Sequence, residues 1–271
     1  MPSYVITGVS KGLGWEFLRL ISNNPNNVVV GIVRDKPATD KRVLEELKER
    51  TNIHILAADV TNYDALKQTA AEATKILGGS LDYLIANAGV VSMFDAYNPI
   101  GELGAKPKAL EENLLGMFNV NVLANIHLYN LFMPLILKGQ VKKVVAISSG
   151  LADTDLTNQY DVTLHSLYAI TKAALNMATA KFNAQYKKDG VLFLSLCPGM
   201  ADVGHYKDAT PEQLEHLGGM TQKFLEYAPH FTGPVTPDVA VQDVVAVWEK
   251  CSLENGDGGA FLSHLGNKQW L

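Results

Sequence analysis

The amino-acid sequence predicts one α/β domain, a three-layer sandwich around a doubly wound parallel sheet of about seven strands. Two observations predict it. Strand-like apolar runs alternate with helix-like segments along the 271 residues, and several of these runs are apolar at consecutive positions. Strands that are covered by helices on both faces have that pattern. Because no repeat, low-complexity tract or linker interrupts the alternation, we expect a single domain over residues 1–271.

The expected elements follow the chain in order. Strands are predicted at 3–7, 28–34, 53–59, 81–87, 141–149 and 191–197, with a seventh short strand near 259–264. Helices are predicted at 12–22, 40–50, 62–77, 109–137, 160–187 and 236–250, and the last follows the cap signal Thr236-Pro237. Two segments rich in glycine and proline, 90–108 and 200–235, depart from the alternation. We expect both to shape a binding wall, the second as a substrate loop or lid.

Composition and charge narrow the choice of partners. Hydrophobic residues make up 47% and the formal net charge is −5, with no long basic run, which argues against nucleic acid and anionic membrane as partners. A small-molecule partner is expected instead. No signal-peptide pattern or membrane-length apolar stretch is present, so the cytoplasm is the expected compartment. Cys197 and Cys251 form no CxxC pair, so both are expected to be buried and no metal site is predicted.

The first strand runs into a glycine-rich turn and then a helix. Gly8, Gly12 and Gly14 give the spacing Gly-x-x-x-Gly-x-Gly. Glycine lets the backbone approach a phosphate, whose charge is met by free N–H groups and the helix dipole. The spacing differs from Gly-x-Gly-x-x-Gly, and an ordinary tight turn is the alternative interpretation.

Two cations lie where a dinucleotide's adenosine ribose is expected. Arg34 ends the second strand and Lys11 lies inside the glycine turn. An acidic residue in place of Arg34 would favour NAD, whereas cations suit a 2′-phosphate, so NADPH/NADP+ is the predicted cofactor. Asp35 follows immediately and is the counter-argument, and a solvated Arg34–Asp35 pair is the alternative.

Polar residues also collect after the central strands. Asn87 follows the fourth strand, and Ser148 and Ser149 end the fifth. In the next helix Tyr168 and Lys172 are four residues apart, on one face. An ammonium near a phenol lowers the phenol pKa, which makes the tyrosine a usable acid at neutral pH.

In this order the motifs resemble the short-chain dehydrogenase/reductase family, which has a Rossmann-type fold, over almost the whole chain. The resemblance implies that the glycine turn holds the cofactor pyrophosphate and that other residues contact the adenine, ribose and nicotinamide. The cofactor residues implied are Gly8, Ser10, Lys11, Gly12, Leu13, Gly14, Arg34, Asp59, Val60, Asn87, Ala88, Gly89, Tyr168, Lys172, Pro198, Gly199 and Met200. Asp59 and Val60 would border the adenine, and the Pro198-Gly199 turn would pack against the nicotinamide.

The resemblance also implies a catalytic set of Asn121, Ser149, Tyr168 and Lys172. Ser149 and Tyr168 would hydrogen-bond a substrate carbonyl, NADPH would deliver hydride to its carbon, and Tyr168 would give the oxygen a proton. Lys172 would hold ribose hydroxyls, and Asn121 would hold a water of the proton relay. Ser148 remains an alternative to Ser149. The predicted function is NADPH-dependent reduction of a ketone or aldehyde.

Two departures from the family pattern stand out. Ser149 and Tyr168 are separated by 19 positions, more than in many members, and the branch of sniffer-type carbonyl reductases and fungal ketoreductases has similar insertions. Val203 stands where many members have a threonine that bonds the nicotinamide carboxamide, so cofactor affinity or loop order is in question.

No motif identifies the substrate, whose pocket we expect residues 90–108, 151–167 and 200–235 to shape. The mix of Met93, Phe94, Met200, Tyr206, Met220, Phe224 and Tyr227 suggests a fairly large apolar or aromatic ketone. His165 and His205 are candidates for substrate contact, although a structural role is the more common one for a histidine. Pairing through 109–137 and 160–187 predicts a homodimer or homotetramer. A redox-silent NADP-binding protein and an NAD-dependent alcohol dehydrogenase are the competing functions.

Overall fold

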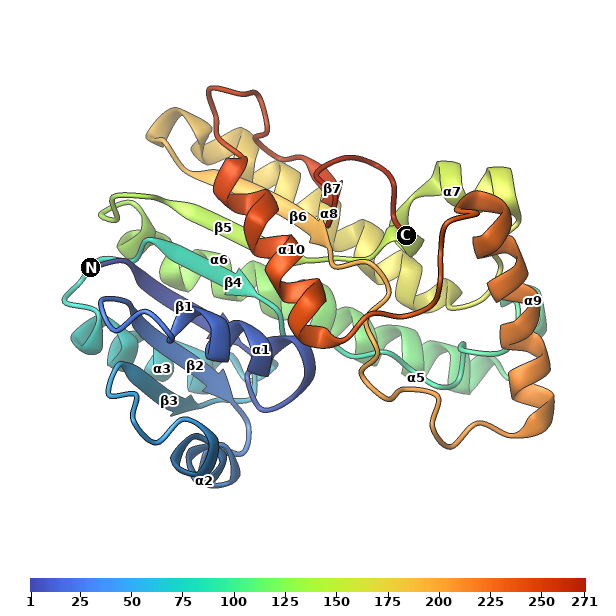
Figure 1. Cartoon of the computed structure of the whole chain (residues 1–271), viewed down its shortest axis with the longest axis horizontal. Coiled ribbons are helices and arrows are strands. Elements are labelled where there is room, and N and C mark those ends of the chain that lie inside the picture. Colours follow the sequence, from blue (N-terminus) through green and yellow to red (C-terminus); the bar gives the residue numbers. More distant parts are fainter.

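The computed structural model describes residues 1–271 and contains one parallel sheet of seven strands. Its order is β3-β2-β1-β4-β5-β6-β7 (Figure 1). The strands are β1 (Ser3–Thr7), β2 (Val28–Val33), β3 (Ile53–Ala57), β4 (Tyr83–Ala86), β5 (Lys143–Ile147), β6 (Leu192–Cys197) and β7 (Phe261–Ser263). Every strand lies within a predicted run and all six pairings are parallel. The single doubly wound α/β domain is therefore confirmed.

Helices cover both faces of the sheet, as Figure 1 shows. They are α1 (Gly12–Ile21), α2 (Lys36–Glu46), α3 (Tyr63–Ile76), α4 (Ile100–Leu103), α5 (Pro107–Phe118), α6 (Ala124–Ile136), α7 (Thr154–Tyr160), α8 (Ser166–Tyr186), α9 (Pro211–Tyr227) and α10 (Pro237–Lys250). Helices α1 and α10 share one apolar cluster with the sheet, whereas α3 and α6 share another. None of the helices is both long and apolar enough to cross a membrane.

The two clusters explain the consecutive apolar residues of the strands. On β1, Tyr4 and Ile6 belong to the cluster under α1 and α10, while Val5 belongs to the one under α3 and α6. Successive side chains of a strand point to opposite faces, so a strand between two helix layers buries both sets. The strand order reverses between β1 and β4, and the crevice beyond their carboxyl ends is where open α/β sheets bind ligands.

Several predicted helix bounds are wrong. The second helix is Lys36–Glu46 and not 40–50, because the Asp35 side chain caps it by accepting from Ala38 N and Pro37 fits its first turn. The predicted helix 160–187 begins at Ser166 and ends at Tyr186. The predicted helix 109–137 is divided into α5 and α6 by a π-helical turn, Asn119–Leu123.

The segments predicted as loops also contain helices. Half of 200–235 forms α9, which has a capping box between Thr210 and Gln213 that outweighs the helix-weakening pair Gly218-Gly219. The insertion between Ser149 and Tyr168 contains α7, and the loop at 90–108 contains the single turn α4.

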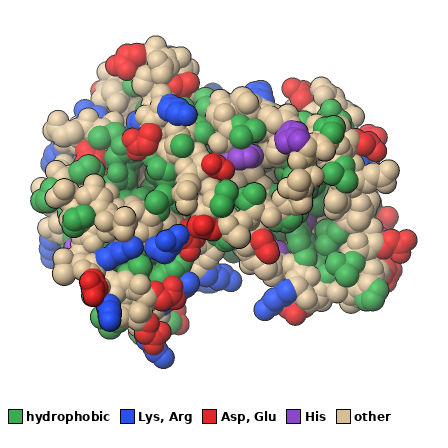
Figure 2. Space-filling model, in the orientation of Figure 1, with side chains coloured by type: hydrophobic (Ala, Val, Ile, Leu, Met, Phe, Trp, Pro, Cys, Tyr) green, Lys and Arg blue, Asp and Glu red, His purple; other side chains and the backbone are tan.

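The two ends of the molecule differ in the side chains on their surfaces. Lys and Arg mix with Asp and Glu over α1 and α2, and hydrophobic side chains gather near α5 and α9 (Figure 2).

Candidate active site

The glycine turn between β1 and α1 has a backbone that only glycine adopts readily. Gly8 and Gly12 have φ angles of +76° and +56°. A Cβ atom at Gly14 would lie 2.1 Å from the Gly8 carbonyl oxygen. The turn therefore needs glycine at all three positions. The turn leads directly into α1, and a glycine-rich turn before a helix is an arrangement that can receive a pyrophosphate.

The ends of β1 and β4 are tied together beside this turn. Thr7 Oγ1 accepts hydrogen bonds from the backbone N–H groups of Asn87 and Ala88 at 3.1 and 3.0 Å. The Asn87 amide donates to the Thr7 carbonyl at 2.9 Å. A Cβ atom at Gly89 would lie 3.5 Å from Lys172 Nζ. The predicted residues 87–89 thus connect the glycine turn to the Tyr168 helix.

The cations at the adenosine end are accessible. Lys11 is exposed and precedes α1, and exposed Arg34 follows β2. Arg34 lies close enough to Asp59 to lower the pKa of that carboxyl, although hydrogen bonds from Thr61 are the larger cause. Asp35, which caps α2, leaves Arg34 without the ion pair that was the alternative interpretation. Of the other predicted cofactor residues, Ser10 is exposed, Val60 is half-buried and Leu13 packs against the first apolar cluster.

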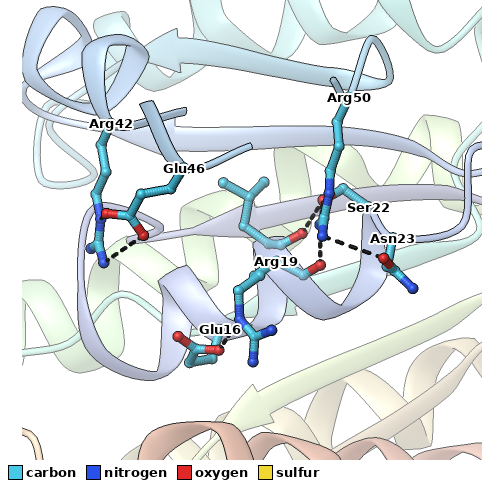
Figure 3. Close-up of polar contacts among 8 residues, drawn as sticks. Glu16, Arg19, Ser22, Asn23, Arg42, Glu46 and Arg50 are labelled. Atoms are coloured by element: carbon cyan, nitrogen blue, oxygen red, sulfur yellow. Dashed lines mark hydrogen bonds and ion pairs between the residues drawn. The ribbon is translucent and has the colours of Figure 1, made fainter. Parts of the chain in front are cut away.

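Sequence reasoning missed Arg42, which reaches the glycine turn from α2. Its Nη1 donates to the Ser10 carbonyl at 3.2 Å, its guanidinium carbon lies 3.8 Å from the centroid of the Trp15 ring, and Nε pairs with Glu46 at 2.7 Å. Figure 3 shows the Arg42–Glu46 pair on one side of α2. The predicted helix 40–50 already contained Arg42, but no local pattern indicates that its side chain reaches back to Ser10.

The two serines after β5 point to different partners. Ser148 is buried and its hydroxyl donates to Asn176 Oδ1 at 2.6 Å, on the inner side of α8. Ser149 caps the 3-10 turn Gly150–Ala152, and its hydroxyl lies close enough to Tyr168 to lower the tyrosine's pKa, against the larger rise that burial causes. Of the two serines that the sequence left open, Ser149 is therefore the one beside the phenol.

Tyr168 and Lys172 share a face of α8. The Lys172 Nζ lies 5.6 Å from the centroid of the Tyr168 ring and donates to the Ile147 carbonyl at 2.7 Å. Burial lowers the pKa of Lys172 from 10.5 to about 8. Burial also raises the pKa of Tyr168 above its ordinary value, with Cys197 and Tyr206 adding to the rise. The expected lowering of the phenol pKa is thus reversed, because loss of hydration outweighs the neighbouring ammonium.

Asn121 lies in the π-helical turn and is fully buried. Its amide accepts from Val90 N at 2.8 Å and donates to the Val90 carbonyl at 2.9 Å and to Thr171 Oγ1 at 3.0 Å. Its own carbonyl accepts from the Asn125 amide at 2.8 Å. π-Helical turns often occur at functional sites, and this one joins the loop after β4 to the helix that carries Tyr168.

A cavity of about 120 Å³ opens beside Ser149. Most of its lining is apolar, and Ser149, His165 and Tyr206 are the polar side chains that could bond a ligand. The lining residues are Ser149, Gly150, Leu151, Leu156, His165, Cys197, Gly199, Met200, Tyr206, Met220, Phe224, Trp270 and Leu271. Leu156, on α7, lies in the segment 151–167 that was predicted to shape the pocket, whereas Trp270, near the C-terminal end of the chain, was not among the predicted pocket residues. Met93, Phe94 and Tyr227 of the predicted set do not line the cavity.

The turn after β6 lies between the cavity and the glycine turn. Gly199, which follows Pro198, has a φ angle of +72°, and a Cβ atom there would lie 3.0 Å from the His264 ring. Val203 lies over the glycine turn: a Cβ atom added at Gly12 would be 3.4 Å from Val203 Cγ1. Desolvation lowers the pKa of His205, and the nearby charge of Lys11 lowers it further. The segment after β6 thus reaches both parts of the site.

No group of three or more His, Cys, Asp and Glu side chains is arranged to hold a metal ion. Both cysteines are buried and free, as predicted. The Cys197 sulfur accepts from Gly150 N at 3.1 Å, behind the cavity.

Comparisons with known proteins agree with this geometry. The short chain dehydrogenase family model matches residues 3–214. The short chain dehydrogenase virK of Hypocrea virens is 58% identical over all of both chains. A short-chain dehydrogenase/reductase of Pestalotiopsis fici, iacC, is 54% identical, again with 100% of each chain covered.

Two solved structures share the fold at low sequence identity. NADPH-bound carbonyl reductase from chicken fatty liver has a TM-score of 0.78 at 23% identity, covering 98% of each chain. The carbonyl reductase Sniffer of D. melanogaster has a TM-score of 0.76 at 22% identity, also with 98% of each chain covered. From the family match, the relatives and the ordered motifs, we conclude that this chain belongs to the short-chain dehydrogenase/reductase family of oxidoreductases.

Proposed function

We propose that the protein reduces a ketone or aldehyde to an alcohol with NADPH. One observation carries the proposal: Ser149, which lines an apolar cavity, lies beside Tyr168, and Tyr168 shares a face of α8 with Lys172, next to a glycine turn that suits a pyrophosphate. A hydroxyl pair beside an ammonium can polarise a carbonyl and supply a proton.

The residues around the glycine turn fit a nicotinamide dinucleotide with a 2′-phosphate. The turn leaves no room for a Cβ atom at Gly14. Lys11 and Arg34 are accessible cations there, and Arg42 approaches the same turn through Ser10. Arginine binds phosphate bidentately, so this charge favours NADPH over NADH. The NADPH-bound chicken carbonyl reductase of the same fold gives further support.

In the proposed reaction the bound cofactor supplies hydride to the carbonyl carbon. Ser149 and Tyr168 donate hydrogen bonds to the carbonyl oxygen. Since burial raises the pKa of Tyr168, the phenol stays protonated at neutral pH and gives its proton to the oxygen as the alcohol forms. The Lys172 ammonium then stabilises the phenolate.

Asn121 has a positioning role in this proposal. Its side chain joins the loop after β4 to Thr171, which lies between Tyr168 and Lys172 on α8. Replacing Asn121 would loosen the helix that presents both residues. That it also orders a water of the proton relay remains our prediction.

The substrate pocket is formed by elements that the sequence predicted only as loops. Leu156 of α7, together with Met220 and Phe224 of α9, gives it an apolar wall. We therefore propose a large apolar or aromatic carbonyl substrate, with the 200–235 segment as the movable side of the pocket.

The decisive test follows the loss of reduced-nicotinamide absorbance for the wild type and Tyr168→Phe. NADPH or NADH is supplied with a panel of aromatic ketones, quinones and aldehydes. We expect turnover with NADPH that falls by at least about 100-fold in the variant, while the variant still binds NADPH. NADPH binding without reduction of any carbonyl would support the redox-silent alternative instead.

Copies of the chain are also proposed to pair through α5, α6 and α8. Leu115 and Phe118 on α5 and Ile170 and Met177 on α8 are exposed large hydrophobic residues. Helix α5 packs beside α8, so these side chains belong to one region of the molecule. Met177→Glu should produce monomers in sedimentation analysis, whereas Leu214→Glu, on exposed α9, should not. A monomeric wild type would contradict this part of the proposal.

A further inference from the structure

Two polar side chains of the cavity, which contact each other, take no part in the proposed reaction. His165 and Tyr206 both line the cavity with Ser149. The Tyr206 hydroxyl lies 2.7 Å from His165 Nε2. His165 is only 2% exposed, and its other ring nitrogen, Nδ1, is buried without a hydrogen-bond partner. A buried imidazole has a high desolvation cost, so this pair needs an explanation.

The backbone at His165 is held in an unusual conformation by the residues that position Tyr168. His165 has a φ angle of +57°, in the left-handed region. Its N–H donates to the Asp95 carbonyl at 2.9 Å, and the Asp95 carboxylate accepts from the N–H groups of Leu167 and Tyr168 at 2.8 and 3.1 Å. Such strain persists where the surroundings impose it, and it clusters at functional sites. The same contacts therefore fix His165 and the start of the Tyr168 helix.

The tautomer of His165 sets the direction of its hydrogen bond with Tyr206. Burial lowers the pKa of His165 and outweighs the opposing charge of Asp95, so the ring has one N–H donor and one acceptor nitrogen. We assign the proton to Nδ1, since Nε2 already contacts the Tyr206 hydroxyl. Nε2 is then an acceptor, so the Tyr206 O–H donates to it. The lone pairs of the Tyr206 oxygen remain available on the cavity side.

Tyr206 lies near the proposed reaction centre, yet apart from it. The two phenols are close enough for Tyr206 to raise the pKa of Tyr168. A carbonyl held by Ser149 and Tyr168 would leave the rest of the substrate against Tyr206, Phe224 and Trp270, all of which line the cavity. The aromatic rings suit a flat hydrocarbon frame.

We propose that Tyr206, oriented by His165, accepts a hydrogen bond from a hydroxyl group on the substrate, so that the preferred substrates are hydroxylated aromatic ketones. This inference rests on the proposed function. Tyr206 is a substrate-contacting residue in it, and His165 is a positioning residue that acts through Tyr206.

The test uses α-tetralone and a set of its monohydroxylated derivatives, with NADPH. For the wild type, kcat/KM for the best hydroxylated probe should exceed that for α-tetralone by about tenfold, the effect of one good hydrogen bond to a desolvated acceptor. Tyr206→Phe should reduce this ratio to about one. His165→Asn should lower the ratio as well, because asparagine tolerates the left-handed backbone but leaves Tyr206 without its acceptor.

Tyr97→Phe is the matched control. The Tyr97 ring lies against Tyr206, at 6.4 Å between centroids, but Tyr97 does not line the cavity. This variant should keep the wild-type ratio. A wild type without preference for any hydroxylated probe, or a Tyr206→Phe variant that keeps the preference, would overturn the inference.

A binding experiment separates this inference from the proposed function. Dissociation constants of the same probes are measured by tryptophan fluorescence on the protein saturated with NADP+, which has no hydride to give. The hydroxylated probe should bind about tenfold more tightly than α-tetralone in the wild type, but not in Tyr206→Phe. That result supports the Tyr206 contact even if no probe is reduced. Reduction of every probe with equal affinities would contradict the Tyr206 contact but leave the proposed reductase function intact.

Discussion

The glycine turn and the substrate cavity are next to each other but are built from different parts of the chain. The turn is formed by residues 8–14, with Asn87 and Ala88 from the loop after β4 beside it. The cavity is lined by residues from the loop after β5, from α7, the start of α8, the segment after β6, α9 and the end of the described chain. The first region depends on backbone conformation and positive charge, and the second on the volume and polarity of side chains.

This difference predicts how each region responds to change. A backbone that approaches a phosphate leaves no alternative to glycine, so substitutions in the turn should be severe. Side chains that line a cavity can exchange volume without loss of the sheet, so substitutions there should alter which substrate is accepted. The mutations below test this contrast.

The largest expected effect belongs to Gly14→Ala. The added Cβ atom would lie 2.1 Å from the Gly8 carbonyl oxygen, so the backbone of the turn must move. We expect NADPH affinity to fall by at least about 100-fold and the free energy of unfolding by about 2 kcal/mol, as measured by titration and urea unfolding.

Gly218→Ala is the control in the cavity region. No atom lies within 4 Å of a Cβ atom at this position of α9. This variant should gain about 0.5 kcal/mol of stability, because alanine is the better helix former, and should bind NADPH like the wild type. Equal effects of the two substitutions would refute the contrast between the regions.

The next effect concerns the choice between cofactors. Arg34→Ala should raise the KM for NADPH by about tenfold or more and leave the KM for NADH nearly unchanged, because only NADPH has the 2′-phosphate. Arg50→Ala is the control: its guanidinium bonds the Arg19 carbonyl and Ser22, as Figure 3 shows, and it should not change the preference. If Arg34→Ala affected both cofactors alike, our cofactor assignment would be wrong.

Phe224→Ala should change substrate selection. Phe224 is 6% exposed and lines the cavity. Its removal should cost about 3 kcal/mol of stability and should shift kcat/KM toward bulkier ketones by roughly tenfold. Leu225→Ala, at the exposed neighbouring position, should do neither. An unchanged order of ketones in Phe224→Ala would show that α9 does not limit substrate size.

The smallest effect is a change of rate with pH. Burial lowers the pKa of Lys172 to about 8, so the ammonium is lost as the pH rises through this value. If the phenolate needs that charge, the reduction rate at saturating substrate should be about half-maximal near pH 8. Lys181→Met, at an exposed position of α8, should leave the profile unchanged. A flat rate through this range would contradict the role of Lys172.

The contribution of Lys172 to the free energy of unfolding changes with pH in a direction that separates the loss of activity from unfolding in alkali. Lys172 has a pKa of about 8 in the folded protein and an ordinary value of 10.5. Between these values the unfolded chain binds more protons, so the contribution of Lys172 to the free energy of unfolding rises with pH. Loss of activity just above pH 8 should therefore occur without loss of this contribution.

Much of the fold followed from local patterns in the sequence. Each strand lies within its predicted apolar run, because a strand between two helix layers must bury both faces. Helix bounds were less predictable. The cap at Asp35 moved α2, and the capping box at Thr210 made a helix of a segment that its glycines had marked as a loop. In both cases a side-chain hydrogen bond at the N-terminus outweighed the glycine and proline content.

The sequence by itself determined the sheet, the glycine turn and the Tyr168–Lys172 spacing, because these depend on residues near one another in the chain. Only the tertiary structure decided that Ser149, and not Ser148, lies beside Tyr168. The two residues are 19 positions apart, and the segment between them contains α7. It alone also placed Arg42 at the turn and Tyr206 on His165, and it reversed the expected pKa shift of Tyr168. These features depend on burial and on contacts between distant segments, which no local pattern specifies.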